Sequence, residues 1–148
     1  MAGVAFAAVT GEISTGTAIK TLLQIVAPTN QRIKLREISV SFKGTSNTAS
    51  PIIVSLTRQT TAGTMSSLTP VKVNEADNET LQVTAQHTAT AEPTSSDVIM
   101  SEEVHPQTGY TWQAPFGGEM VVIGGGRVGV RVTAAADVSA IARVFGEE

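Results

Sequence analysis

Residues 31–61 constrain the fold more than any other stretch, because they contain two strand-like runs joined by a polar connection. In the first run, apolar and polar residues alternate, but the alternation slips by one residue at Arg36 and Glu37. Such a slip is typical of a β-bulge, which lets both halves of a strand bury the same face. The second run places three large apolar residues on one face: Ile52, Val54 and Leu56. Residues 43–50 between the runs have turn chemistry, so we predict a β-hairpin or a pair of strands that crosses between two sheets.

The rest of the chain contains further short alternating or apolar runs, separated by turns rich in Gly, Pro, Asn and Ser. We expect strands at residues 19–25, 81–88, 98–104, 110–114, 120–123, 127–132 and 139–145, at most a short strand at residues 71–73, and a flexible connection at residues 60–70. No stretch has the pattern of an amphipathic helix. Strands of this length, with turns every ~8–12 residues, predict an all-β fold: a sandwich, a jelly roll or a barrel.

The N-terminal residues 1–17 are mostly small and show no clear period. We interpret them as an extended arm or an edge strand, which could not hold itself in place without other contacts. Residues 18–148 then form the single globular domain, because a chain of this length is large enough for one core without covalent staples.

Composition excludes several classes of function. The formal net charge is -3 and the chain lacks a basic stripe, so nucleic-acid binding is not expected. No apolar run approaches the ~20 residues that a membrane span needs, and the N-terminus lacks the basic region of a signal peptide. There are no cysteines, hence neither disulfides nor thiolate metal sites. Charged residues make up only 16%, which suits a β-protein with a Thr- and Ser-rich surface that neighbours cover.

Two patterns could indicate a ligand site, and we interpret both as ordinary structure. Residues 124–129 match the glycine pattern of dinucleotide-binding loops, but an alternating strand follows them where that site needs a helix. His87 and His105 are the only histidines, and even with Glu102 and Glu103 near the second they do not form the cluster that a metalloenzyme requires. We therefore expect no metal and no cofactor.

No catalytic constellation is apparent either. The chain has no nucleophile elbow, and its acidic residues 75–79 lack the spacing of a calcium loop, so we expect a solvated turn there and no enzyme activity. Trp112, with Tyr110 and Phe116 nearby, is interpreted as core or interface. Three arginines on C-terminal strands are candidate interface anchors, although ordinary solvated charges are an equal alternative: Arg127, Arg131 and Arg143.

Three stretches together resemble the capsid decoration, or cement, proteins of tailed bacteriophages: APTNQRIKLREISVSFKGTSNTASPIIVSLTRQTTAGT, TATAEPTSSDVI and HPQTGYTWQAPFGGEMVVIGGG. The resemblance covers roughly residues 20–146 and rests on pattern and phrase. It implies a jelly-roll-type β-sandwich on the outer surface of the virion, which binds the major capsid protein and stabilises its lattice. It also implies a homotrimer or a homodimer. We expect no catalytic residues, and the chain has a mildly acidic net charge; both agree with this role.

Under this interpretation, the N-terminal arm clamps a neighbouring subunit through Val4, Phe6 and Val9, with Phe6 as the anchor because it has the largest apolar area. Replacing Phe6 by alanine would then weaken shell binding and leave the melting temperature of the domain unchanged. Two alternatives remain. A receptor- or glycan-binding module of a fibre or adhesin would use Tyr110 and Trp112, and a cupin-like metalloenzyme would use His87 and His105.

Overall fold

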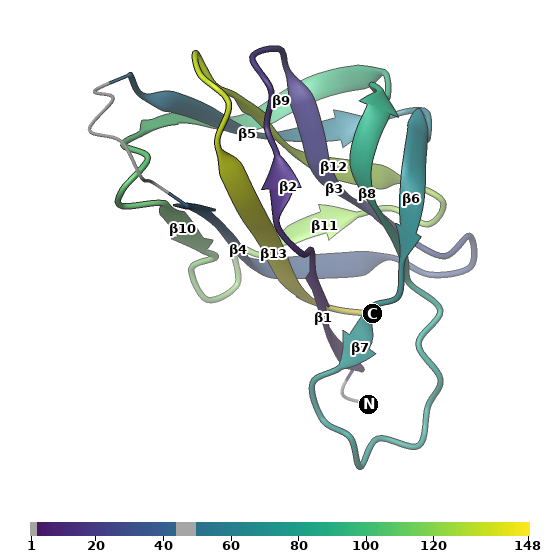
Figure 1. Cartoon of the computed structure of the whole chain (residues 1–148). Coiled ribbons are helices and arrows are strands. Elements are labelled where there is room, and N and C mark those ends of the chain that lie inside the picture. Colours follow the sequence, from purple (N-terminus) through teal and green to yellow (C-terminus); the bar gives the residue numbers. More distant parts are fainter. Residues whose placement is uncertain (1–2, 44–49) are drawn as a thin grey trace.

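The computed structural model describes residues 3–43 and 50–148, and in this part of the chain every regular element is a β-strand. Thirteen strands form two antiparallel sheets that pack face to face (Figure 1). The predicted single-domain antiparallel β-sandwich is therefore confirmed. The finer jelly-roll assignment remains a prediction.

The seven-stranded sheet has the order β10-β4-β13-β1-β7, with β11 also on β4 and β2 also on β13. Its strands are β1 (Ala5–Val9), β2 (Ile13–Ser14), β4 (Ile33–Lys43), β7 (Val71–Lys72), β10 (Tyr110–Gln113), β11 (Met120–Val122) and β13 (Ser139–Glu147). The six-stranded sheet has the order β6-β8-β3-β12-β5-β9. Its strands are β3 (Lys20–Val26), β5 (Ile52–Gln59), β6 (Thr64–Leu68), β8 (Thr84–Ala91), β9 (Ser95–Val104) and β12 (Arg127–Thr133).

The core lies between the two sheets and consists of alternating aliphatic side chains from both. Its largest fully buried members include Phe6, Leu23, Ile25, Ile33, Leu35, Ile38, Ile52 and Leu56. Alternation along each strand sends these side chains inward and leaves the polar residues between them outside. The expected face of β5 is confirmed, because Ile52, Val54 and Leu56 are buried and Ile53 is exposed.

The bulge predicted in β4 is also present. Along β13, Phe145 pairs with Glu37 and the next residue, Gly146, pairs with Leu35, so Arg36 is the extra residue. The bulge returns Leu35 and Ile38 to the same buried face. It also separates β10, which pairs with residues 37–40, from β11, which pairs with residues 33–35.

Of the two arrangements expected for residues 31–61, the crossing pair is correct, because β4 belongs to one sheet and β5 to the other. The turn predicted between them cannot be followed throughout, because residues 44–49 lie outside the described residues.

The N-terminal segment does not extend from the domain, which corrects the expected arm. β1 is an interior strand that pairs with β13 on one side and with β7 on the other. Phe6 lies opposite Gly146, and a Cβ atom on that glycine would come within 2.7 Å of the Phe6 ring. The small residues that suggested an arm are small because Ala7, Ala8 and their neighbours pack inside a sheet.

The connection expected at residues 60–70 is not a simple loop, because it contains β6, which pairs with β8. β8 pairs with β3 only up to His87, and the next residue, Thr88, has a φ of 56°. This conformation is uncommon for a residue other than glycine and marks the point where β8 bends. Beyond it, Thr60 and Thr94 are joined by a backbone hydrogen bond of 2.8 Å, which ties together the segments that follow β5 and β8.

Candidate interaction surfaces

The three N-terminal site residues are not available together as a clamp. Phe6 is fully buried and Val4 is 8% exposed, so both belong to the folded domain. Val4 also exchanges two backbone hydrogen bonds of 3.0 Å with Glu148. Only Val9, at 47% exposure, has a side chain that a partner could cover.

Arg127 and Arg131 hold a buried polar layer on the six-stranded sheet. The Gln24 amide nitrogen donates to Gln59 Oε1 at 2.7 Å, and the Gln59 amide nitrogen donates to Thr21 Oγ1 at 3.1 Å. Arg127 Nη1 donates to Gln24 Oε1 at 3.1 Å, which satisfies the remaining acceptor. Arg131 Nη1 donates to Ser95 Oγ at 3.2 Å. Each arginine therefore binds within its own chain. Arg127 connects β12 to β3 through Gln24, and Arg131 connects β12 to β9 through Ser95.

Glu92 closes this layer from the segment between β8 and β9. Its carboxylate accepts hydrogen bonds from the Thr21 backbone nitrogen at 2.8 Å and from the Thr21 hydroxyl at 2.6 Å. A second contact fixes the segment after β5, because Gln24 Nε2 donates to the Thr61 carbonyl at 3.0 Å. These bonds attach both connecting segments to β3.

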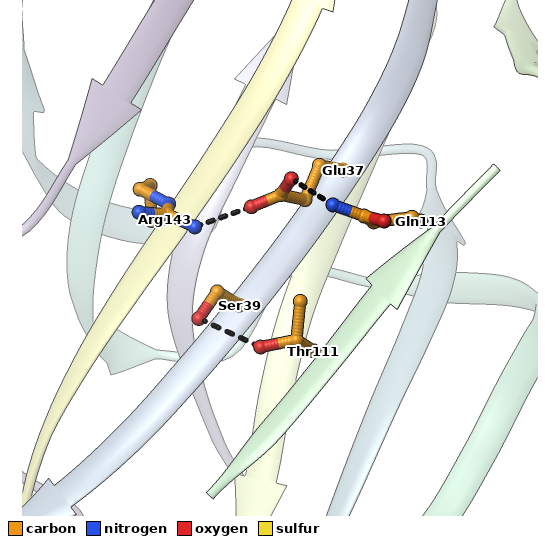
Figure 2. Close-up of polar contacts among 5 residues, drawn as sticks. All are labelled: Glu37, Ser39, Thr111, Gln113 and Arg143. Carbon is orange, nitrogen blue, oxygen red and sulfur yellow. Dashed lines mark hydrogen bonds and ion pairs between the residues drawn. The ribbon is translucent and has the colours of Figure 1, made fainter.

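Arg143 lies at one end of a polar ladder on the outer face of the seven-stranded sheet, with Glu37 in the middle (Figure 2). It forms an ion pair with Glu37 on β4, and Glu37 also accepts a hydrogen bond of 2.9 Å from Gln113 on β10. The guanidinium lies 4.6 Å from the centroid of the Phe145 ring, within range of a cation–π contact. Glu37 thus links three strands, β13, β4 and β10, and Arg143 is bound within its own chain and only partly exposed.

Trp112 lies at the side of the sandwich where β9 and β10 end the two sheets. It lines an apolar hollow of about 390 Å³ between them, together with Leu56, Ile99, Met100, Gly118 and Met120. The Tyr110 hydroxyl donates to Met100 Sδ at 3.0 Å, which joins the two edge strands. Burial, and secondarily the negative charge of Glu102, raise the pKa of Tyr110 above its ordinary value.

Exposed apolar side chains also occur on the segments that contribute residues to this hollow, although Phe116 itself lines a separate hollow with Arg36, Ala114 and Glu119. Phe116 is fully exposed on the loop that contributes Gly118, while Val98 is 56% and Ile99 42% exposed on β9. We call this surface the β9–β10 edge, defined by Val98, Ile99, Met100, Trp112, Phe116, Gly118 and Met120. Other exposed apolar residues, including Val71 and Ile123, lie away from the hollow.

The glycine-rich turn leads into a strand, as predicted, since β12 begins at Arg127. The turn lines a hollow of about 670 Å³ with Arg58, whose Nη1 donates to the Val121 carbonyl at 3.3 Å. A Cβ atom on Gly124 would come within 2.8 Å of the Thr29 carbonyl oxygen, so close packing explains the glycine there. No helix starts at this turn to bind a pyrophosphate.

The remaining candidates do not converge. His87 Nδ1 lies 2.9 Å from the Thr88 hydroxyl on β8, whereas His105 is in an exposed turn and accepts a hydrogen bond from the Gln107 nitrogen. In residues 3–43 and 50–148, no group of three or more His, Cys, Asp or Glu is placed to hold a metal ion. The acidic turn is held by its own bonds, such as Asn74 Nδ2 to Asp77 Oδ1 at 2.8 Å.

Sequence reasoning missed most of the β9–β10 edge, although it named Trp112. Ile99, Met100 and Met120 come from different strands, and only the sandwich brings them together. The signal for Phe116 was present, because a lone aromatic residue between Pro115 and Gly117 is on a turn and cannot reach the core.

Searches against protein-family models, curated proteins and solved structures found no match to this chain. Within the described part of the chain, no helix is long and apolar enough to cross a membrane.

Proposed function

We propose that the protein is a structural component of a bacteriophage virion, which binds the outer surface of the capsid and stabilises the lattice of the major capsid protein. The main structural support is the β9–β10 edge. It combines an open apolar hollow, lined by the exposed Ile99, with an exposed Val98 on the same strand and a fully exposed Phe116 on the loop that contributes Gly118. Exposed apolar surface of this kind is typical of interaction sites. The resemblance of the sequence to decoration proteins names the partner class.

The mechanism follows from mass action. A protein that binds the assembled lattice and not its free subunits stabilises the lattice in proportion to the logarithm of its concentration. A homotrimer that contacts three lattice positions gains a further ~10²–10⁴-fold in avidity, because the second and third contacts become intramolecular. Neither effect requires catalysis or a cofactor.

The direct test is native mass by light scattering, followed by co-sedimentation with undecorated capsids. We expect a trimer or a dimer that saturates the shells at a fixed ratio to capsid protein. The edge is tested with Phe116→Ala, which should weaken binding and leave folding intact because the side chain is fully exposed. The matched control is Val71→Ala. Val71 is 59% exposed on β7, which lies at the opposite end of the seven-stranded sheet from β10. A monomer that does not bind shells would contradict the proposal.

The open hollow beside Trp112 also favours a second candidate, a glycan-binding module of a phage fibre or an adhesin. A partly exposed tryptophan next to a hollow can stack on the apolar face of a sugar. Binding on a glycan array that Trp112→Ala abolishes, together with no binding to shells, would establish this alternative.

A further inference from the structure

β9 is the last strand of the six-stranded sheet, and no other strand of the described chain pairs with its outer edge. An edge of this kind presents unpaired backbone N–H and C=O groups and can accept another strand. β9 is ten residues long, and seven of them are exposed, at positions 96–99 and 101–103. It therefore offers a long template for strand addition.

The charges on β9 select against some partners. Asp97, Glu102 and Glu103 are exposed, and none of them takes part in the ion pairs found within the described residues. If β9 of a second copy paired with it antiparallel over its full length, Asp97 would lie opposite Glu102. Like charges in that position destabilise a strand pair, so self-pairing is disfavoured. A strand that carries lysine or arginine would be attracted instead.

The hollow next to β9 adds an apolar requirement. Its volume is about 390 Å³, and its lining includes Ile99 and Met100 of β9 itself. A cavity of ~150 Å³ is enough for a benzene ring, so the hollow has room for a large apolar side chain. A segment that pairs with β9 would have this hollow beside it and could fill it without a change in the sandwich.

We propose that β9 and the hollow form a docking site for an extended segment of the partner that carries lysine or arginine and one large apolar residue. The segment adds to the six-stranded sheet as a further strand, and its apolar side chain enters the space between β9 and β10. That the partner is a capsid protein rests on the proposed function. The preference for a basic segment with one large apolar residue rests only on β9 and the hollow.

The probe is a short synthetic peptide in which lysine and threonine alternate around a central leucine. Trp112 is the only tryptophan and lines the hollow, so its emission should shift to the blue as the leucine enters. We expect saturable binding that weakens with added salt. The same peptide with glutamate in place of lysine should not bind. A peptide N-methylated along one edge should also fail to bind, because it cannot form the backbone ladder.

The protein variant is Asp97→Lys with Glu102→Lys, which should weaken binding of the lysine peptide by about tenfold or more. The control is Glu75→Lys with Glu79→Lys, an equal change of charge in an exposed turn away from β9, which should bind like the unmodified protein. Unfolding curves for both variants verify that they fold. Equal affinity for the lysine and glutamate peptides, an unmoved Trp112 emission, or unchanged affinity of the β9 double variant would overturn the docking site.

Shell binding separates this inference from the proposed function. If the unmodified protein co-sediments with capsids but does not bind the lysine peptide, and the β9 double variant co-sediments equally well, the docking site is wrong and the capsid role stands. If the unmodified protein binds the lysine peptide but not capsids, the docking site stands and the capsid role is wrong.

Discussion

The Gln59 side chain lies directly over Gly129, at the point where β5 and β12 pair. A Cβ atom on Gly129 would come within 2.4 Å of the Gln59 amide. The glycine therefore leaves the space through which Gln59 reaches its partners Thr21 and Gln24.

Gly129→Ala should destabilise the protein by about 1–3 kcal/mol, because the new methyl group displaces Gln59 from a buried hydrogen-bonded position. Chemical denaturation measures the change. Gln59→Ala should also destabilise, since it removes the buried hydrogen bonds that Gln59 forms with Gln24 and Thr21. Because both substitutions disrupt the same contacts, their effects in the double variant should sum to less than the two single effects. Strict additivity would show that Gln59 does not depend on the space above Gly129.

Phe6→Ala should lower the free energy of unfolding by about 3–5 kcal/mol, because the ring is fully buried between the sheets. This result would be the reverse of the unchanged melting temperature that follows from a free arm. Val9→Ala serves as the control on the same strand. At 47% exposure it should change stability by no more than about 0.5 kcal/mol. Similar melting temperatures for Phe6→Ala and the unmodified protein would place the ring outside the core.

Arg143 and Glu37 should show a measurable coupling energy, because Glu37 is only 17% exposed at its side chain and accepts a second bond from Gln113. A double-mutant cycle with Arg143→Met and Glu37→Gln should give about 1 kcal/mol, at the upper end for partly exposed pairs. Arg36→Met with Glu147→Gln provides a comparison, since Arg36 is 54% exposed. That second pair should couple more weakly and lose its coupling in high salt.

Tyr110 should ionise above the ordinary tyrosine value near 10, because burial and then Glu102 raise its pKa. The folded protein then retains the phenolic proton at a pH where the unfolded chain has begun to release it. This stabilisation is complete below about pH 10 and is lost as the pH rises through the folded pKa. Tyr110 is the only tyrosine, so its phenolate absorbance reports the titration directly. Glu102→Gln should lower the pKa partway toward the ordinary value, and an unshifted titration would contradict this account.

Local pattern was sufficient for much of the fold. The slip at Arg36 predicted the bulge in β4, and the alternation in β5 and β12 predicted their buried faces, because each depends on neighbouring residues in sequence. β6 was missed because its five residues have no large apolar member that is fully buried. These residues form a strand because they pair with β8, and that pairing cannot be read from their own composition.

The candidate site could be predicted less well, for a related reason. Arg127, Arg131 and Arg143 were named as candidate interface anchors because they lie on a surface with few charges. Their partners Gln24, Ser95 and Glu37 are distant in sequence, so only the fold shows that the arginines bind within the chain. The hollow at Trp112 likewise depends on the position of β9 relative to β10.

The position of β13 between β4 and β1 has a consequence for biosynthesis. Residues 139–147 supply the shared partner of two strands that leave the ribosome much earlier, so the seven-stranded sheet cannot close while those residues are still in the exit tunnel. Until then, β1 and β4 each have an unpaired edge where β13 will bind, and their apolar faces are uncovered. Sheets built from such distant pairings close slowly, and nascent chains crowded on one messenger would be exposed to cross-pairing during that delay.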